Sequence, residues 1–415
     1  MTTFDQITIF DIGKTPLKID KPIRLIELFA GIGSQAKALE RLGVDFEHYR
    51  VCEFDKYAIK SYNAIHGTNF AISDITQYKA SNLGIVDTDK YCYLMTYSFP
   101  CQDLSIAGNQ KGMAKGSNTR SGLLWEVERL LNECIELPQI LLMENVTQVH
   151  GKKNSEHFYE WIEFLESKGY SNYWQDLNSK DYGIPQNRNR TFMVSVLGDY
   201  TYKFPQGFQL KLMLKDVLED SVDEKYYLKR KAIEYIAKRV GTYTQICDEN
   251  TETTKCAITA VGNQNWTGNF IKEVKIEVAC NLYNEGVKGF NRDTREILNT
   301  SGLCKTIQTM QGGNRQPKIL EVWDGYNQRI RVEKGTIGTL TTNCGFDITR
   351  NGQGIIEHHS RIRKLTPKEC WRLMGFDDAD FDKAAKVNSN AQLYKQAGNS
   401  IVVDVLVEIF KVMFL

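Results

Sequence analysis

The sequence IRLIELFAGIG, residues 23–33, joins a short apolar run to a glycine-containing turn, and an amphipathic pattern follows over residues 34–42. A strand that leads through glycines into a helix is the repeating unit of an alternating strand and helix fold. We expect further strands at residues 49–52, 91–97, 140–143 and 191–196, and helices at residues 57–66, 123–136 and 156–168. This alternation predicts an α/β fold whose sheet is mostly parallel.

Composition describes an ordinary globular chain with no strong charge. The 415 residues exceed the usual limit for one core, so we expect two domains. Hydrophobic residues make up 42% and charged residues 25%, and 52 basic against 51 acidic side chains leave a net charge of +1. A protein that binds polyanions by bulk charge is therefore excluded, and any nucleic-acid surface must be a local patch.

The cysteines and the N-terminus bear on the cellular environment. Ten cysteines lie between Cys52 and Cys370 without a CxxC pair, so we expect no metal cluster and no disulfide framework, but reduced thiols. The N-terminus lacks the features of a signal peptide, and no run of about 18 apolar residues could span a bilayer. We expect a cytoplasmic protein without a membrane partner.

The amino-acid composition of the sequence changes after Pro205. A charged segment reaches Arg239, and the region beyond it is rich in Thr, Gly, Asn and Gln with short β-type runs, which favours a β-rich domain of looped hairpins. Three pieces look faintly alike: residues 257–270, 305–320 and 337–356. An internal repeat and a coincidence of composition both remain open for these pieces.

A helical pattern returns after residue 361. Thr366 as a cap, Pro367 in the first turn and Glu369 after it predict a helix that ends near Met374, with Gly375 as its terminator. A last helix at residues 400–414 has an apolar stripe broad enough to pack on the sheet. We therefore expect one discontinuous domain, residues 1–200 and 361–415, and a second domain, residues 201–360.

Three strand ends carry groups that suit a nucleotide-like ligand. The glycines of residues 29–33 let a ligand approach backbone amides at a helix start, although the third glycine of the usual dinucleotide pattern is absent. Glu53 ends the next strand and is placed to accept ribose hydroxyls, and Asp74 could read an adenine amino group. Solvated strand-end carboxylates are the alternative for both residues.

Cys101 follows another apolar strand and is the candidate nucleophile. Pro100 before it, polar residues after it and a glycine-containing stretch with Lys111, Lys115 and Arg120 favour exposure on a mobile loop. We expect these cations to favour the thiolate. The alternative is a buried, inert cysteine.

Glu144 ends the strand at residues 140–143. Burial there raises the pKa of a carboxyl group, which suits an acid that must hold a proton near neutral pH, although a paired core carboxylate is the alternative. Arg188 and Arg190 alternate toward one side before a further strand, where they could face an anion or a base. The alternative is that these two arginines form ordinary salt bridges on the surface.

The ordered motifs resemble the cytosine-C5 DNA methyltransferases of bacteria and phage. Six of them carry the resemblance: FAGIG at residues 29–33, PCQ at 100–102, ENV at 144–146, QxRxR at 186–190, RKLTPxE at 363–369 and GNS at 398–400. The match covers about residues 23–200 and 361–415. It implies a Rossmann-like catalytic domain that binds S-adenosyl-L-methionine, with a target-recognition domain at residues 201–360.

The resemblance also implies a mechanism. Cys101 attacks C6 of a cytosine flipped out of the duplex, Glu144 protonates or hydrogen-bonds N3, Arg188 supports the flipped base, and Asn145 orders the catalytic loop. The implied catalytic residues are Cys101, Glu144, Arg188, Arg190, Asn145 and Gln102.

Cofactor and DNA contacts are carried over from the family in the same way. The implied S-adenosyl-L-methionine contacts are Phe29, Ala30, Gly31, Ile32, Gly33, Glu53, Phe54, Asp74, Ile75, Pro100, Leu124, Asn399 and Ser400. The implied contacts to double-stranded DNA are Lys111, Arg120, Asn314, Arg315, Thr339 and Arg363. Asn and Arg side chains suit the reading of base edges, with plain polar turns as the alternative.

Departures from the family are confined to the catalytic loop, where Phe99 replaces a common Pro and Asp103-Leu104-Ser105 replaces a Pro-Phe-Ser type continuation. They alter loop stiffness and remove no reacting group. There are three alternatives. The first is an RNA cytosine-C5 methyltransferase, which the large middle region disfavours, and the others are a dinucleotide oxidoreductase with a redox thiol and an inactive DNA-binding module. We expect a monomer, with a cognate restriction endonuclease acting separately as a possible partner.

Overall fold

The computed structural model describes residues 14–226, apart from 102, 105–111, 118 and 213, and then residues 278–281, 296–298, 304–305, 318–324, 329–330 and 358–415. Six strands form the main sheet: β2 (Ile23–Leu28), β3 (Phe46–Cys52), β4 (Cys92–Tyr97), β5 (Ile140–Asn145), β6 (Tyr170–Asn178) and β8 (Asn189–Leu197). Two short strands, β1 (Thr15–Pro16) and β9 (Tyr200–Thr201), pair with each other.

The sheet has the order β3-β2-β4-β5-β8-β6. Pairing is parallel from β3 through β5, whereas β8 runs antiparallel to both of its neighbours. The predicted mostly parallel α/β sheet is confirmed. Strand β6 was not predicted, because it lies at the sheet edge and most of its side chains are only partly buried, so its apolar signal is weak.

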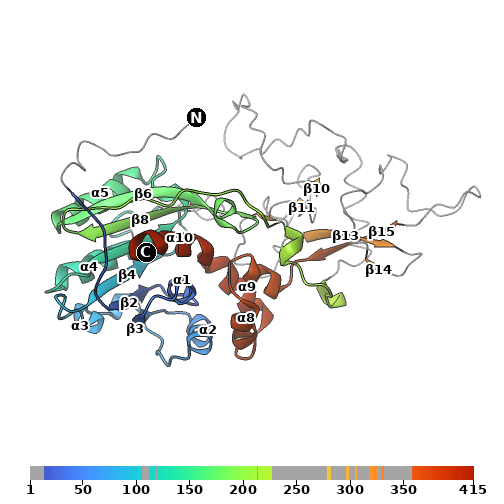
Figure 1. Ribbon diagram of the computed structural model, residues 1–415, viewed down its shortest axis with the longest axis horizontal. Coiled ribbons are helices and arrows are strands. Elements are labelled where there is room, and N and C mark those ends of the chain that lie inside the picture. Colours follow the sequence, from blue (N-terminus) through green and yellow to red (C-terminus); the bar gives the residue numbers. More distant parts are fainter. Residues whose placement is uncertain are drawn as a thin grey trace, which may run out of the picture.

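Helices cover both faces of this sheet. The described helices are α1 (Ser34–Leu42), α2 (Lys56–His66), α3 (Ala80–Leu83), α4 (Leu124–Glu133), α5 (Ser155–Ser167), α7 (Pro367–Arg372), α8 (Asp378–Ala385), α9 (Asn390–Asn399) and α10 (Val403–Phe414). Of these, α8 and α9 lie beside the sheet and contact α2 and α7. Alternate residues of β5 face opposite ways: Ile140 and Leu142 pack with α1 and α10, whereas Leu141 and Met143 pack with α4 and α5. Figure 1 shows these two helical layers on either side of the sheet.

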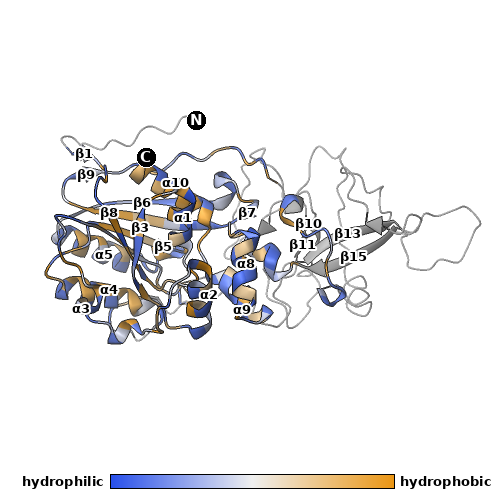
Figure 2. Cartoon of the chain, turned by 60° about the horizontal axis from the view of Figure 1, so that its bottom comes forward, coloured by the Kyte–Doolittle hydropathy of each residue, from blue (hydrophilic) through white to orange (hydrophobic). Residues whose placement is uncertain are grey.

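The C-terminal helices are part of the same core as the first strands. Thr366 and Glu369 form the predicted capping box at the start of α7, and Gly375 follows this helix with φ +79°. Helix α10 is largely hydrophobic (Figure 2) and is buried against α1 and the sheet. Among the helices that the structure describes, none is both long and apolar enough to cross a bilayer.

Several predicted boundaries were wrong. The helix expected at residues 123–136 is a 3-10 turn, η3 (Ser121–Leu123), followed by α4, which ends at Glu133. The helix expected at residues 400–414 begins at Val403, because Ser400 ends α9 in an extended conformation. Helices α8 and α9 were not predicted. Their exposed faces are mixed and polar, so they show no long apolar stripe.

Four strands of the middle region, together with one strand that crosses its predicted end at residue 360, form a second sheet, in agreement with the predicted β-rich character. These are β10 (Val278–Asn281), β11 (Glu296–Leu298), β13 (Lys318–Asp324), β14 (Arg329–Ile330) and β15 (His358–Lys364). A separate strand, β12 (Cys304–Lys305), pairs with β7 (Gln186–Asn187). The possible repeats lie largely outside the described residues.

Candidate active site

Cys101 lies just beyond the carboxyl end of β4, in a loop fixed by side chains from neighbouring elements. The Asn145 amide at the end of β5 donates to the Phe99 carbonyl (2.9 Å), and the Ser121 hydroxyl donates to the Pro100 carbonyl (2.6 Å). Asn145 therefore fixes the backbone of this loop at Phe99, and an ordering role is what the resemblance to the family implies for it. Ser121 was missed, because a serine in a polar stretch carries no distinguishing signal.

Asp103 closes the same loop from its other side. Its carboxylate accepts from the Arg120 amide (2.8 Å) and its carbonyl accepts from the Gly112 amide (3.0 Å). Asp103, which departs from the family pattern, is only 6% exposed and holds the loop together through these two hydrogen bonds. Arg120 is exposed, whereas Gln102 and Lys111 lie outside the described residues.

Glu144, near the end of β5, forms the acidic part of the site. Its side chain is buried, and Oε1 lies 3.2 Å from Nε of Arg190 on the adjacent strand β8. Burial raises the pKa of Glu144, and the positive charges of Arg190 and Arg188 oppose this shift. The direction is the one expected for an acid that keeps its proton near neutral pH.

The Cys101 thiol corrects one expectation. Cys101 is half-buried, and this burial raises its pKa, with a further increase from the Glu144 charge. Arg190 and Arg188 lower the pKa, but desolvation outweighs them, so the predicted net stabilisation of the thiolate was wrong. The charges of Glu144, Arg188 and Arg190 all act on the pKa of Cys101, in keeping with the neighbouring positions of β4, β5 and β8 in the sheet.

Arg188 is buried at 4% exposure and connects two distant parts of the chain. Its Nη2 donates to the Ser400 carbonyl (2.7 Å) and the Gly398 carbonyl (3.3 Å). Burial lowers the pKa of Arg188 to about 9, with a further decrease from Arg190. In this structure the guanidinium therefore ties the C-terminal end of α9 to the residue between β7 and β8.

The turn between β2 and α1 presents backbone groups at the helix start. Gly31 and Gly33 both have positive φ values, of +59° and +82°, and the Gly31 amide donates to Oε2 of Glu53 (2.8 Å). Ala30 and Ile32 are buried and anchor the turn, while Phe29 is partly buried with φ +58°. The glycine turn after β2 and the Glu53 carboxylate after β3 are therefore in direct contact.

The second strand end supplies a carboxylate beside an exposed ring. The Glu53 Oε1 atom accepts from the Asp55 amide (2.7 Å), and burial raises the Glu53 pKa against the effect of these backbone donors. The neighbouring Phe54 side chain is 73% exposed, which is unusual for a large apolar group. This ring is available for stacking on a flat ligand.

The remaining candidate cofactor residues differ in exposure. Asp74 caps η2 (Ile75–Gln77) by accepting from the Thr76 amide (2.9 Å), and Ile75 is buried. Leu124 is fully buried in the core at the start of α4, so its side chain does not face an open site.

Asn399, the last residue of α9, is exposed, and Ser400, which follows it, is buried. The Ile401 amide donates to the Ser34 hydroxyl (3.3 Å), which ties this segment to the first turn of α1. Asn314, Arg315 and Thr339 lie outside the described residues, and Arg363 lies within β15.

Comparison with known proteins adds independent evidence. The family model for C-5 cytosine-specific DNA methylases matches residues 23–415. A type II methyltransferase, M2.ScrFI of Lactococcus lactis subsp. cremoris, is 29% identical over 94% of this chain and 99% of its own length. The orphan methyltransferase M.SPBetaI of Bacillus phage SPbeta is 30% identical over 94% of this chain and 97% of its own.

Solved structures agree with the fold. The methyltransferase EhMeth of Entamoeba histolytica superposes with a TM-score of 0.62 at 15% identity, covering 95% of this chain and 98% of its own. The Dnmt2 methyltransferase of S. pombe superposes with a TM-score of 0.58 at 16% identity, covering 94% and 97%. At these identities the likeness concerns the fold alone.

Proposed function

Because the chain belongs to the family of C-5 cytosine-specific DNA methylases, we propose that it flips a cytosine out of duplex DNA and methylates C5 through a covalent adduct with Cys101. The observation that carries this proposal is the shared site of Cys101, Glu144 and Arg190 at adjacent strand ends. C5 of cytosine is a poor nucleophile until a bond to C6 makes it electron-rich.

The roles of the residues follow from their environments. The Cys101 thiolate adds to C6, and Glu144 delivers its proton to N3, so that the electron pair of the broken C5–C6 double bond becomes available at C5. Arg190, ion-paired with Glu144, holds the carboxyl group in place. After methylation, a base accepts the C5 proton, the C5–C6 double bond forms again as the thiolate leaves C6, and the N3 proton returns to Glu144.

S-adenosyl-L-methionine is the methyl donor in this proposal, and it supplies an electrophilic methyl group. The residues around the glycine turn fit such a molecule: the exposed Phe54 ring suits an adenine, and Glu53 suits ribose hydroxyls. Residues 29–33 would hold the amino acid part, and Asp74 the adenine amino group. Asn399 and Ser400 lie on the segment that Arg188 ties to this site.

We also propose that residues 1–200 and 361–415 form the catalytic domain and that residues 201–360 choose the DNA sequence. Support comes from the shared core of the first strands and α7 to α10, and from the separate sheet of the middle region. Lys111, Arg120, Asn314, Arg315, Thr339 and Arg363 remain the proposed DNA contacts.

Substrate and target can be tested together. Bisulfite sequencing of DNA from a host that expresses the chain should reveal 5-methylcytosine within one short sequence, absent from a host that expresses Cys101→Ser. Host RNA sequenced in parallel separates DNA from RNA methylation. An unmodified genome in cells that hold the folded protein would contradict the proposal.

The covalent step has its own test. A duplex with 5-fluorocytosine at the target position, offered with S-adenosyl-L-methionine, should stay attached to the protein, because fluorine at C5 cannot leave as a proton. Cys101→Ser should give no adduct, whereas Cys134→Ser, a change to a half-buried thiol at the end of α4, should react as the wild type does. An adduct that survives Cys101→Ser would assign attack to another residue.

A further inference from the structure

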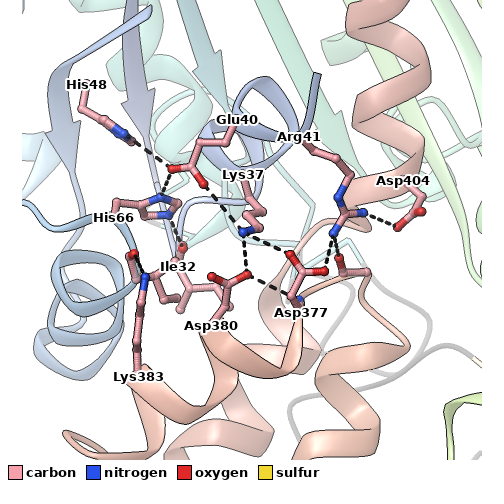
Figure 3. A network of polar contacts seen from close by, with 12 residues as sticks. Ile32, Lys37, Glu40, Arg41, His48, His66, Asp377, Asp380, Lys383 and Asp404 are labelled. Atoms are coloured by element: carbon pink, nitrogen blue, oxygen red, sulfur yellow. Dashed lines mark hydrogen bonds and ion pairs between the residues drawn. The ribbon is translucent and has the colours of Figure 1, made fainter. Parts of the chain in front are cut away.

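Three side chains from different elements converge beneath the glycine turn. Glu40 of α1, His48 of β3 and His66 of α2 each offer a ligand atom, and these atoms lie within 4.8 Å of one another. Nδ1 of His66 is 2.7 Å and Nε2 of His48 is 3.8 Å from the same oxygen, Oε1 of Glu40. Figure 3 shows both rings directed at this carboxylate.

The second nitrogen of each ring is fixed by a buried partner. The Tyr62 hydroxyl donates to the buried carboxylate of Glu27 (2.5 Å), so its oxygen accepts from Nδ1 of His48 (3.0 Å). A neutral His48 then carries its lone pair on Nε2, which faces Glu40.

The second ring nitrogen of His66 is fixed by a backbone carbonyl group. Its Nε2 lies 3.2 Å from the Ile32 carbonyl, which can only accept, so Nε2 carries a proton. The 2.7 Å contact between Nδ1 of His66 and Oε1 of Glu40 holds a second proton, and Nδ1 becomes a metal ligand once that proton is lost. Partners of this kind, which fix the tautomer and direction of an imidazole, are the usual outer shell of metal-binding histidines.

Surrounding charges leave the cluster open to a cation. Lys37 lies 3.7 Å from the second oxygen of Glu40, but its ammonium is paired with Asp380 (2.8 Å) and Asp377 (3.2 Å). The His66 side chain is fully buried, whereas that of Glu40 is 35% exposed. Water can thus reach the cluster from the carboxylate side.

We propose that Glu40, His48 and His66 bind one divalent transition-metal ion of the zinc type, with water as the fourth ligand. Zinc takes two imidazoles and a carboxylate at about 2.0–2.2 Å, which places tetrahedral ligand atoms about 3.3 Å apart. The contacts of Oε1 of Glu40 with His66 (2.7 Å) and His48 (3.8 Å) depart from this spacing in opposite directions, so the three side chains must adjust when the ion binds. Mixed nitrogen and oxygen ligands disfavour calcium and magnesium, which prefer oxygen alone.

The proposed ion would support the turn that holds residues 31–33. A Cβ atom added to Gly33 would lie only 2.3 Å from Nε2 of His66 and 2.7 Å from the Tyr62 ring. The cluster therefore lies directly beneath this turn and links α1, β3 and α2. On metal binding, the proton held between His66 and Glu40 passes to solvent.

Metal titration of the full chain, stripped of ions with a chelator, tests the site. Zn²⁺ should bind with one equivalent and raise the melting temperature, and Co²⁺ should give the visible bands of a tetrahedral nitrogen and oxygen site. His48→Gln and Glu40→Gln should each weaken binding by at least about 100-fold, and Tyr62→Phe, through the outer shell, by about 10- to 100-fold. His157→Gln, a histidine paired with Glu160 on the surface of α5, should bind as the wild type does.

Three outcomes would overturn the proposal: no stoichiometric binding by the folded wild type, unchanged affinity in both His48→Gln and Glu40→Gln, or the intense thiolate-to-cobalt band of a cysteine site. Glu40→Gln keeps the test meaningful if His48→Gln misfolds, because Glu40 is partly exposed. Circular dichroism of each variant establishes that it is folded. Failure here would leave the methylation proposal untouched, since its tests use no metal.

Discussion

Burial acts on Cys101 and Glu144 in the same direction but with opposite chemical consequences. Burial favours the neutral carboxyl group of Glu144, the direction that the proposed proton donor requires, and it also favours the neutral thiol of Cys101. Attack on C6 needs the thiolate. Arg190 moderates both effects, because its positive charge favours both anions.

The Cys101 pKa can be read from its rate of alkylation by iodoacetamide, followed by peptide mapping. In the free wild type, the half-maximal rate should lie at a higher pH than for an unperturbed thiol, because desolvation dominates. Arg190→Gln should move the midpoint to still higher pH, since a charge that stabilises the thiolate is lost. Lys115→Gln, which removes an exposed lysine paired with Glu128, should leave it in place. A midpoint that falls in Arg190→Gln would contradict this account.

Glu144→Gln removes the proton donor and keeps the shape of the side chain. The single-turnover rate of methylation should fall by about 10²- to 10⁴-fold, the usual contribution of a positioned general acid. DNA affinity should change little, because the benefit of Glu144 arises in the transition state. Filter binding and methyl transfer measured on the same preparation separate the two effects, and an unchanged rate would remove Glu144 from its role.

At the scale of elements, turns with little sequence signal hold the site together. Gly375 ends the α7 segment beside the start of α10, where a Cβ atom would lie 2.2 Å from Oδ2 of Asp404 and 3.2 Å from Cβ of Val403. This close approach lets α7 and α10 enter one core. Gly43, which ends α1, has a similar φ of +68° but nothing within 4 Å of such an atom.

Substitution of these two glycines by alanine measures how much the close packing around Gly375 contributes to the free energy of unfolding. Gly43→Ala should cost about 1–2 kcal/mol of unfolding free energy, from left-handed backbone strain alone. Gly375→Ala should cost more, by roughly 1–3 kcal/mol, because the helices must also separate. Urea unfolding of both variants gives the comparison, and equal losses would show that packing at Gly375 is unimportant.

At the scale of the whole molecule, chemistry and the choice of DNA sequence are assigned to separate parts. The first strands and α7 to α10 share one core, whereas β13 and β15 belong to a second sheet. This division suggests that the middle region can be exchanged without rebuilding the catalytic site.

Exchange of residues 240–350 for the corresponding segment of a related enzyme should therefore transfer the methylated sequence. Bisulfite maps before and after the exchange provide the measurement, and a chimera that also carries Cys101→Ser is the inactive control. If an active chimera retains the original map, target choice lies outside this segment.

Local patterns were sufficient to predict the alternating strands and helices, the Thr366 capping box and the strand-end positions of Cys101 and Glu144. Periodicity, capping and the polarity of strand ends are short-range properties, so they can be read from neighbouring residues. Edge strand β6 and the partly polar helices α8 and α9 were not predicted, because an element that is buried on only one side has a weak hydrophobic pattern.

Only the tertiary structure decided which distant groups meet. It brings Arg188 to the carbonyls of residues 398 and 400, turns β8 antiparallel to β5, and gathers Glu40, His48 and His66 into one cluster. It also decided the sign of the Cys101 pKa shift, because desolvation depends on every element that covers the thiol. A sequence specifies the groups that are present, whereas distance and exclusion of water, which set their energies, arise only when the chain is folded.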